Sequence, residues 1–327
     1  IKRLMENFQY ILPEIFISAS IMLFLLFGVF KKNSANLIYN LSTISLVILL
    51  ALIINLSSFN KIYLFNSSYL IDNLSNYMKI ILVGSGIFVM LTGSRYIQVI
   101  NLNKIEYPIL ILSSILGMMI MISSNDLIVF YMGLELQSLA LYVLASFNRD
   151  NLLSTESGLK YFVLSALSSG LLLYGCSLTY GFSESTNFDQ ILINSTEFNY
   201  GTTFGIVFIL VGLAFKISAV PFHMWAPDVY QGSPTSVTLF FAILPKIAAL
   251  SVFIKFLYTP FANMNDQWQT IIVFISIASM ILGAVAAIGQ KNLKRLIAYS
   301  SISHMGYALA GLATVSNQGI QSSITYI

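Results

Sequence analysis

Long apolar runs, separated by short polar segments, make up most of this sequence. A helix that spans a lipid bilayer needs about 20 predominantly apolar residues, and about ten runs reach that length. They lie near residues 10–30, 37–56, 75–95, 107–123, 126–147, 158–181, 203–224, 236–258, 269–289 and 293–314, and an eleventh begins near Gly319. The pattern predicts an all-α polytopic membrane protein with about ten transmembrane helices.

The composition supports this class. Of the 327 residues, 57% are hydrophobic and 9% are charged, whereas soluble domains carry about 25% charged residues. The single cysteine, Cys176, excludes an intrachain disulfide and a cysteine-built metal site, and the two histidines lie far apart in the sequence. We therefore expect a lipid bilayer around the chain, with no metal site and no nucleic-acid partner.

The basic residues predict an orientation. The loops after the odd-numbered spans carry Lys31, Lys32, Arg95, Lys104, Arg149, Lys160, Lys291, Lys294 and Arg295. The N-terminus and the loops after the even-numbered spans carry only Lys2, Arg3 and Lys61. Because positive residues collect on the cytoplasmic side, the N-terminus should face outward.

Charged residues near the ends of spans have an ordinary explanation. Lys79 and Lys255 lie near span ends, where a lysine can extend its ammonium group to the membrane surface. Glu14, near the outer end of the first span, is expected at the interface. His223 and Trp225, which follow a proline-containing stretch, are expected there as well.

Three ionisable residues lie much deeper, and they are the candidate site. Glu135 lies at the middle of the fifth span, Lys246 at the middle of the eighth, and Lys216 a little past the middle of the seventh. Each costs roughly 2.5–3.5 kcal/mol at a helix centre, so such residues are usually functional. The pKa of a lysine shifts readily on burial, and a neighbouring carboxylate opposes that shift. These properties predict proton transfer through the three residues, and a buried structural pair of Glu135 with Lys216 is the alternative.

Two prolines lie close to the deep lysines. Pro221 and Pro245 have no N–H, so the carbonyls of Ile217 and Phe241 should lose their helical partners. Irregular backbone at membrane depth is tolerated only where protein or water satisfies it. We therefore expect a helix break beside each lysine, on a hydrated proton path.

His304, in the stretch SSISHMGY, is a further candidate. Its ordinary pKa of about 6.5 suits a proton relay. The alternative is a hydrogen-bonded packing residue.

A weak internal repeat accompanies these features. A shift of 165 positions lays LQSLALYVLA (136–145) over SISHMGYALA (301–310). The two segments start from opposite sides of the membrane, so the repeat would be inverted. Inverted repeats with broken helices are the architecture of ion-coupled transporters.

Several stretches together resemble one known family. GLELQSLALYVLA, FKISAVPFHMWAPDVYQGSPTSVT, LPKIAAL and QKNLKRLIAYSSISHMGYALAG are similar to the antiporter-like membrane subunits of respiratory complex I, the proton-translocating NADH:quinone oxidoreductase. The resemblance implies a fourteen-helix fold with two inverted five-helix units, each containing a broken helix. It divides the chain into helices 1–3 (1–106), a first unit of helices 4–8 (107–258) and the start of a truncated second unit (269–327). The chain would then be a fragment that lacks the C-terminal part.

The resemblance also implies a function. Members of the family pump protons, powered by quinone reduction elsewhere in the complex, and their functional glutamate and lysines fall on Glu135, Lys216 and Lys246. NADH, FMN, iron–sulfur clusters and quinone are bound by other subunits, so no cofactor is expected in this chain. The implied partners are the other membrane subunits of complex I, including the sister antiporter-like subunits.

Other functions stay open. A subunit of a multisubunit Na+/H+ antiporter would share the buried charges, and a structural subunit would use them as an ion pair. The expected location is a bacterial inner membrane, with a mitochondrial inner membrane as the alternative.

Overall fold

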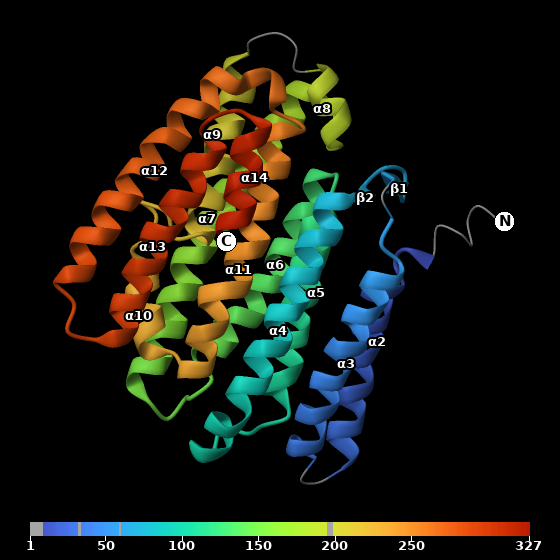
Figure 1. Ribbon diagram of the computed structural model, residues 1–327, viewed down its shortest axis with the longest axis vertical. Helices are drawn as coiled ribbons and strands as arrows, with labels where there is room; N and C mark the ends of the chain where they lie inside the picture. The colour runs from blue at the N-terminus through green and yellow to red at the C-terminus, as the bar shows by residue number, and fades with distance from the viewer. Residues whose placement is uncertain (1–8, 32–33, 59, 195–198) are drawn as a thin grey trace.

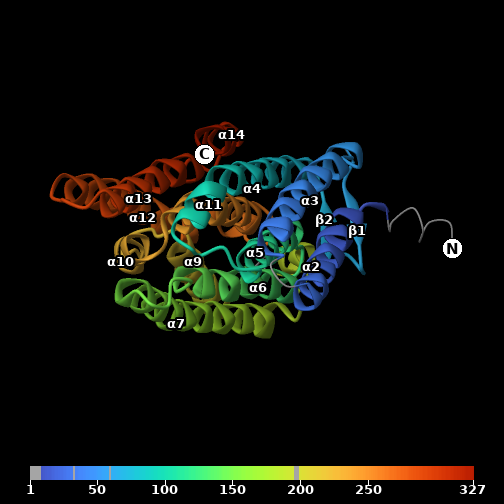
Figure 2. The same ribbon diagram turned by 90° about the horizontal axis from the view of Figure 1, so that it is seen from below.

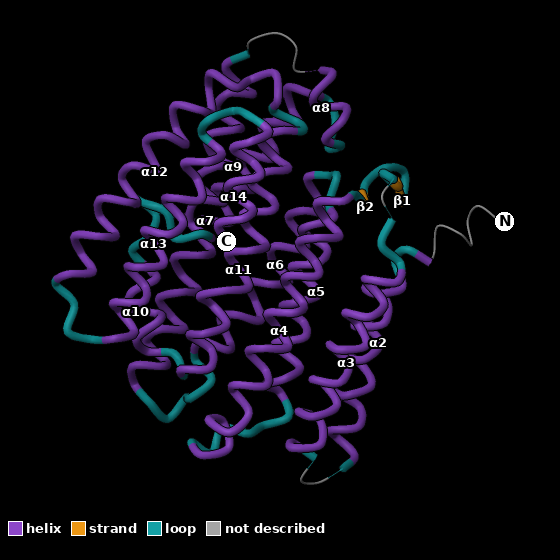
Figure 3. The backbone as a smooth tube through the Cα atoms, in the orientation of Figure 1, coloured by secondary structure: helices purple, strands orange, loops and turns teal. Residues whose placement is uncertain are grey.

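The computed structural model describes residues 9–31, 34–58, 60–194 and 199–327. The helices are α2 (Leu12–Phe30), α3 (Ala35–Asn55), α4 (Asn73–Val99), α5 (Glu106–Ser123), α6 (Leu127–Ala145), α7 (Leu152–Ser183), α8 (Phe188–Asn194), α9 (Tyr200–Lys216), α10 (Trp225–Gly232), α11 (Thr235–Tyr258), α12 (Asn265–Ile288), α13 (Leu293–Leu312) and α14 (Asn317–Tyr326), with a short 3₁₀ helix η1 (Ala262–Met264). The strands β1 (Ile62–Leu64) and β2 (Tyr69–Ile71) form one antiparallel hairpin. Figure 3 shows how completely helix dominates the backbone.

The prediction of an all-α membrane fold is confirmed. In the described part, eight helices are long and apolar enough to cross a membrane. Two of the predicted spans, near 203–224 and 293–314, correspond to helices that are not among these eight. The first corresponds to α9, which stops after 17 residues, and the second to α13, which begins with two basic residues and is less apolar.

The long helices run alternately up and down, so successive connections lie at opposite ends of the bundle (Figure 1). We call the lower end in Figure 1 the basic end, because the connections after α2, α4, α6 and α12 lie there and carry Lys31, Lys104, Arg149 and Lys291, while Arg95 lies near the end of α4. The hairpin and α8 lie at the opposite end. The basic residues Lys2, Arg3 and Lys32 lie outside the described residues. The structure thus gathers the basic loops on one side.

Helix α11 forms the centre of the molecule. In its most apolar window, 83% of the residues are buried, against 33% for α2 and 28% for α12. It contacts α4, α5, α9, α10 and α13. Figure 2 shows α2 and α3 on one side of it and α12 and α13 on the other. The outer helices expose apolar side chains, as a lipid-facing surface requires.

Glycine residues let α5 and α6 pack closely together. A Cβ atom on Gly117 of α5 would lie 2.6 Å from the backbone nitrogen of Gln137 on α6. A Cβ atom on Gly133 would lie 2.8 Å from the backbone nitrogen of Met121. Small residues at such contacts let two membrane helices approach closely, and this contact fixes the position of α6.

The predicted helix break in the seventh span is confirmed, but it starts earlier than Pro221. Helix α9 ends at Lys216, and Ser218 adopts a left-handed backbone with φ of 62°. The backbone groups of the break are satisfied by protein. Trp225 Nε1 donates to the Phe215 carbonyl at 2.9 Å, and the nitrogen of Val220 donates to a serine hydroxyl on α12 at 2.9 Å. Lys216 is therefore the last helical residue before an irregular segment.

The predicted break at Pro245 is wrong. Helix α11 runs continuously through the proline, from Thr235 to Tyr258. The carbonyl of Phe241, which Pro245 leaves without a helical donor, accepts a hydrogen bond from Tyr230 Oη at 3.2 Å. A tertiary donor thus replaces the missing backbone donor, and the helix has no need to open.

Candidate functional site

Lys216 lies at the end of α9 with its side chain inside the bundle, where 5% of the residue is exposed. Its Nζ donates to Ser138 Oγ on α6 at 2.7 Å and to Ser165 Oγ on α7 at 2.8 Å. It also lies 5.9 Å from the centre of the Tyr142 ring. Hydroxyl groups, and not a carboxylate, therefore make the direct contacts with this buried lysine.

Glu135 precedes Ser138 by one turn of α6. Its Oε1 is buried and has no hydrogen-bond partner in the described part of the chain. No ion pair within 4.0 Å joins it to Lys216 among the described residues. A direct ion pair between Glu135 and Lys216 is therefore not formed in the described part of the chain.

Lys246 lies at the middle of the central helix α11 and is 5% exposed. Its Nζ has no hydrogen-bond partner within the described ranges, and it sits 5.9 Å from the centre of the Tyr230 ring. A cation over an aromatic face is stabilised by the ring quadrupole. Lys246 also lines a pocket of about 390 Å³ together with Ser301 and His304.

The structure brings His304 and Lys246 to the same pocket. The His304 side chain is exposed, and its Nδ1 lies 2.8 Å from Tyr326 Oη. The residue is thus hydrogen-bonded without being part of the buried core. Its role as a proton relay stays a prediction.

A row of aromatic rings connects the two lysines. Tyr142 meets Tyr161 edge to face at 5.0 Å, Tyr161 stacks on Trp225 at 4.5 Å, and Trp225 meets Tyr230 at 6.4 Å. Lys216 lies over the first ring and Lys246 over the last. The expectation that Trp225 lies at the interface is wrong, since it is 3% exposed. The irregular segment before it turns the indole inward to cap the end of α9.

A second set of buried charges was missed from the sequence. Lys79 Nζ lies 2.6 Å from Glu14 Oε1 and 3.0 Å from Tyr69 Oη, and Tyr69 donates to Glu14 at 2.7 Å. Lys255 Nζ lies 4.0 Å from Asp72 Oδ1. The expectation that Lys79 and Lys255 extend to the membrane surface and that Glu14 lies at the interface is wrong, because all three residues are buried inside the protein.

A signal for the Glu14–Lys79 pair was present. Each residue lies four positions into a span that starts at the outer end, near 10 and near 75. Opposite charges at equal depth in two spans can pair across the helices.

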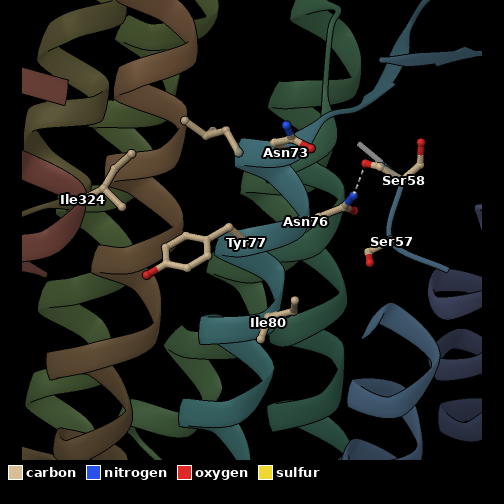
Figure 4. A pocket seen from close by; sticks show the side chains of 8 residues that line it. Ser57, Ser58, Asn73, Asn76, Tyr77, Ile80 and Ile324 are labelled. Carbon is tan, nitrogen blue, oxygen red and sulfur yellow. Dashed lines mark hydrogen bonds between the residues drawn. The ribbon is translucent and has the colours of Figure 1, made fainter. Parts of the chain in front are cut away.

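A neutral pocket lies at the end of α4 opposite the basic end (Figure 4). Ser57, Ser58, Asn73, Asn76 and Tyr77 line it, and Asn76 Nδ2 donates to the Ser58 carbonyl at 3.2 Å. The lining holds no carboxylate, lysine or histidine. This pocket is therefore uncharged, unlike the site around Glu135, Lys216 and Lys246.

In the described residues, no group of three or more His, Cys, Asp or Glu side chains could hold a metal ion. The expectation that cofactors are bound by other subunits stays a prediction.

Comparison with known proteins places these features in a family. The family described as "NADH:quinone oxidoreductase/Mrp antiporter, TM" matches residues 124–327. The chain is 71% identical over 325 residues to NADH-quinone oxidoreductase subunit N of Pelagibacter ubique, covering 99% of this chain and 69% of that protein. It is 48% identical over 318 residues to the protein of the same name from Parvibaculum lavamentivorans, covering 97% and 66%. The chain thus spans about two thirds of the length of these relatives.

Solved structures share the fold. Respiratory complex I from Thermus thermophilus matches with a TM-score of 0.80 and 28% identity, over 96% of this chain and 67% of that one. The Mrp complex from Dietzia sp. matches with a TM-score of 0.85 over 98% of this chain and 61% of that one, and its 19% identity shows the fold alone. With a deep lysine at a helix break and a close relative over nearly its whole length, the chain belongs to the family of NADH:quinone oxidoreductase/Mrp antiporter transmembrane subunits.

Proposed function

We propose that this chain is a proton-translocating membrane subunit of a bacterial NADH:quinone oxidoreductase. The observation that supports this most directly is Lys216, a buried lysine that ends a broken helix and is held only by hydroxyl groups and an aromatic ring. Such a lysine can exist with or without its proton, because no salt bridge fixes its charge. Its partners in this proposal are the other membrane subunits of the complex.

Glu135 controls the charge of Lys216 in this mechanism. While the carboxylate is ionised, it favours the protonated lysine. When quinone reduction elsewhere in the complex changes the charge near Glu135, the lysine holds its proton less tightly and releases it. Each tenfold change in proton affinity corresponds to about 1.36 kcal/mol, so a modest electrostatic change is sufficient.

Lys246 is the next proton-binding group. It lies beyond the aromatic row, without a hydrogen-bond partner in the described part of the chain. The pocket that it shares with His304 offers the proton an onward acceptor. The order of transfer is therefore Lys216, Lys246 and then His304.

The proposal includes the orientation and the division into units. The basic end faces the cytoplasm and the N-terminus faces outward, across a bacterial inner membrane. The first five-helix unit, 107–258, corresponds to α5 to α11, and the start of the inverted second unit, 269–327, corresponds to α12 to α14, although α5 begins at Glu106 and α12 at Asn265. The helix pairs α5–α6 and α12–α13 both pack closely through glycine, which supports the repeat.

The proposed function is tested by replacing Lys216 with Met in the full-length chain, within the assembled complex in liposomes. A positioned proton-transfer group contributes roughly 10²–10⁴-fold to its step, so we expect NADH-driven proton uptake to fall at least about tenfold. NADH oxidation by an artificial electron acceptor should be unchanged, since it needs no membrane subunit.

The exposed Lys61, replaced by Met, is the matched control. Normal proton uptake by the Lys216→Met complex would show that this lysine is not on the proton path.

The description of the matching family also names the Mrp antiporter, so a subunit of a multisubunit Na+/H+ antiporter is the second candidate function. A Na+/H+ antiporter subunit would give sodium-dependent proton movement without NADH oxidation. A native gel stained for NADH dehydrogenase activity separates the two functions, because only a complex I subunit migrates with the active band.

A further inference from the structure

The two serines that bind Lys216 differ in the hydrogen bonds that their hydroxyl groups donate. Ser138 Oγ donates to the carbonyl of Leu134 at 2.6 Å, so towards Lys216 it acts only as an acceptor. Ser165 Oγ accepts from Lys216 at 2.8 Å and from Tyr142 Oη at 2.6 Å. It donates to no acceptor among the described residues, so its proton is free to turn.

This difference defines a direction for proton movement. A neutral lysine amine has a lone pair, and only a hydroxyl with a free proton can approach it as a donor. Ser165 meets that condition and Ser138 does not. Tyr142 already directs its hydroxyl proton at Ser165. The row Tyr142, Ser165, Lys216 is therefore ordered for proton delivery to the lysine.

The row starts at the appropriate end of the bundle. Tyr142 lies in the last turn of α6, next to the basic end. The hydroxyls of Ser154 and Ser157 bind the carbonyl of Ala145 at 2.9 and 3.3 Å, and so they fix the end of α6 against the start of α7. Ser165 is fully enclosed and lies well inside α7, which begins at Leu152. The backbone of Tyr142, three residues before the end of α6, is thus nearer the basic end than that of Ser165.

We propose that Tyr142 and Ser165 are the proton-input relay of Lys216, with Ser138 as a positioning residue. The relay rests on the proposed function, and it assigns the side from which Lys216 is filled. The Ser165 O–H bond breaks as an N–H bond forms on Lys216, and the Tyr142 O–H bond breaks as a new O–H bond forms on Ser165. A hydronium ion from the water at the basic end returns a proton to Tyr142, so neither a tyrosinate nor an alkoxide remains.

The relay is tested with Ser165→Ala and Tyr142→Phe in the complete complex, reconstituted in liposomes and carrying the full-length chain. Removal of a relay hydroxyl should lower NADH-driven proton uptake at least about tenfold, because a positioned proton-transfer group contributes roughly 10²–10⁴-fold to its step. Ser165→Thr keeps the hydroxyl and should restore uptake. Ser168→Ala is the matched control, because Ser168 is a buried serine on the same helix whose Oγ lies 3.5 Å from the Gly212 carbonyl.

The outcomes separate the relay from the function on which it rests. Wild-type uptake in both Ser165→Ala and Tyr142→Phe, together with loss of uptake in Lys216→Met, overturns the relay alone. Wild-type uptake in Lys216→Met overturns the proposed function. If Ser165→Ala prevents assembly on a native gel, Tyr142→Phe decides the question, and an equal loss in Ser168→Ala also counts against the relay.

Discussion

The Glu14 and Lys79 pair is the clearest buried ion pair of the described chain, at 2.6 Å and with both residues more than nine-tenths enclosed. Replacing Lys79 with Met should lower the free energy of unfolding by about 3–5 kcal/mol, because the Glu14 carboxylate would stay buried without its charged partner. The unfolding temperature of the full-length chain in detergent measures this loss.

The double variant Glu14→Gln with Lys79→Met should regain most of that stability, because no buried charge is left over. The exposed Lys61→Met variant should change stability by no more than about 0.5 kcal/mol. A single Lys79→Met variant as stable as the Lys61→Met control would contradict the importance of the pair.

At the residue scale, the position of a charge within an apolar run predicted the burial of Lys216 and Lys246 correctly. The role of these lysines and of Glu135 in proton transfer stays a prediction. Lys79 and Lys255 were misjudged because a position near a span end does not say which side of the helix faces protein. That information depends on the neighbouring helices, and a single sequence does not give their arrangement.

At the element scale, the contact between α5 and α6 gives a sharp prediction. Replacing Gly133 with Ala would place Cβ 2.8 Å from the backbone of Met121, and the helices would have to move apart. We expect a loss of about 1–3 kcal/mol, as for other overpacked cores. Thermal unfolding of the full-length chain in detergent measures it.

Gly84 provides the matched control, since nothing lies within 4 Å of its Cβ position. Alanine there should be neutral or stabilising by about 0.5–1 kcal/mol, because glycine weakens a helix interior. Equal stability of the two variants would mean that the α5–α6 contact yields without cost.

The two prolines show why helix breaks were only partly predictable. Both remove a backbone donor, and the sequence shows this directly. Around Pro221, Trp225 Nε1 donates to the Phe215 carbonyl, the Val220 nitrogen donates to a serine hydroxyl of α12, and the chain leaves the helix at Lys216. Around Pro245 a single tyrosine hydroxyl meets the free carbonyl, and the helix continues. In both places the partners come from other helices, so a single sequence does not show which proline breaks its helix.

At the scale of the whole molecule, orientation can be measured directly. A cysteine in place of Lys291 lies at the basic end, and one in place of Asn60 lies beside the hairpin at the other end; both positions are exposed. The native Cys176 is buried and gives little background. A membrane-impermeant maleimide added to intact cells with a permeable outer membrane should label the Asn60→Cys protein and leave Lys291→Cys unlabelled.

Permeabilising the inner membrane should then allow Lys291→Cys to react, which controls for accessibility. The reverse labelling pattern would place the N-terminus in the cytoplasm. The fold class itself was predictable at this scale, since run length alone separates membrane helices from loops. The central position of α11 could not be predicted, because its residues are no more apolar than those of the lipid-facing α12.

The bond between Tyr230 and the Phe241 carbonyl makes α10 part of the mechanical support of α11. The turn that ends at Pro245 has one backbone bond fewer than its neighbours, so it is the point at which the central helix bends most easily. Its replacement donor, Tyr230, comes from α10, the short helix that follows the irregular segment and precedes α11 in the chain. A displacement of α10 would therefore remove that donor and let α11 flex beside the lysine. In this way a movement that begins at the irregular segment after Lys216 would reach Lys246 through one hydrogen bond.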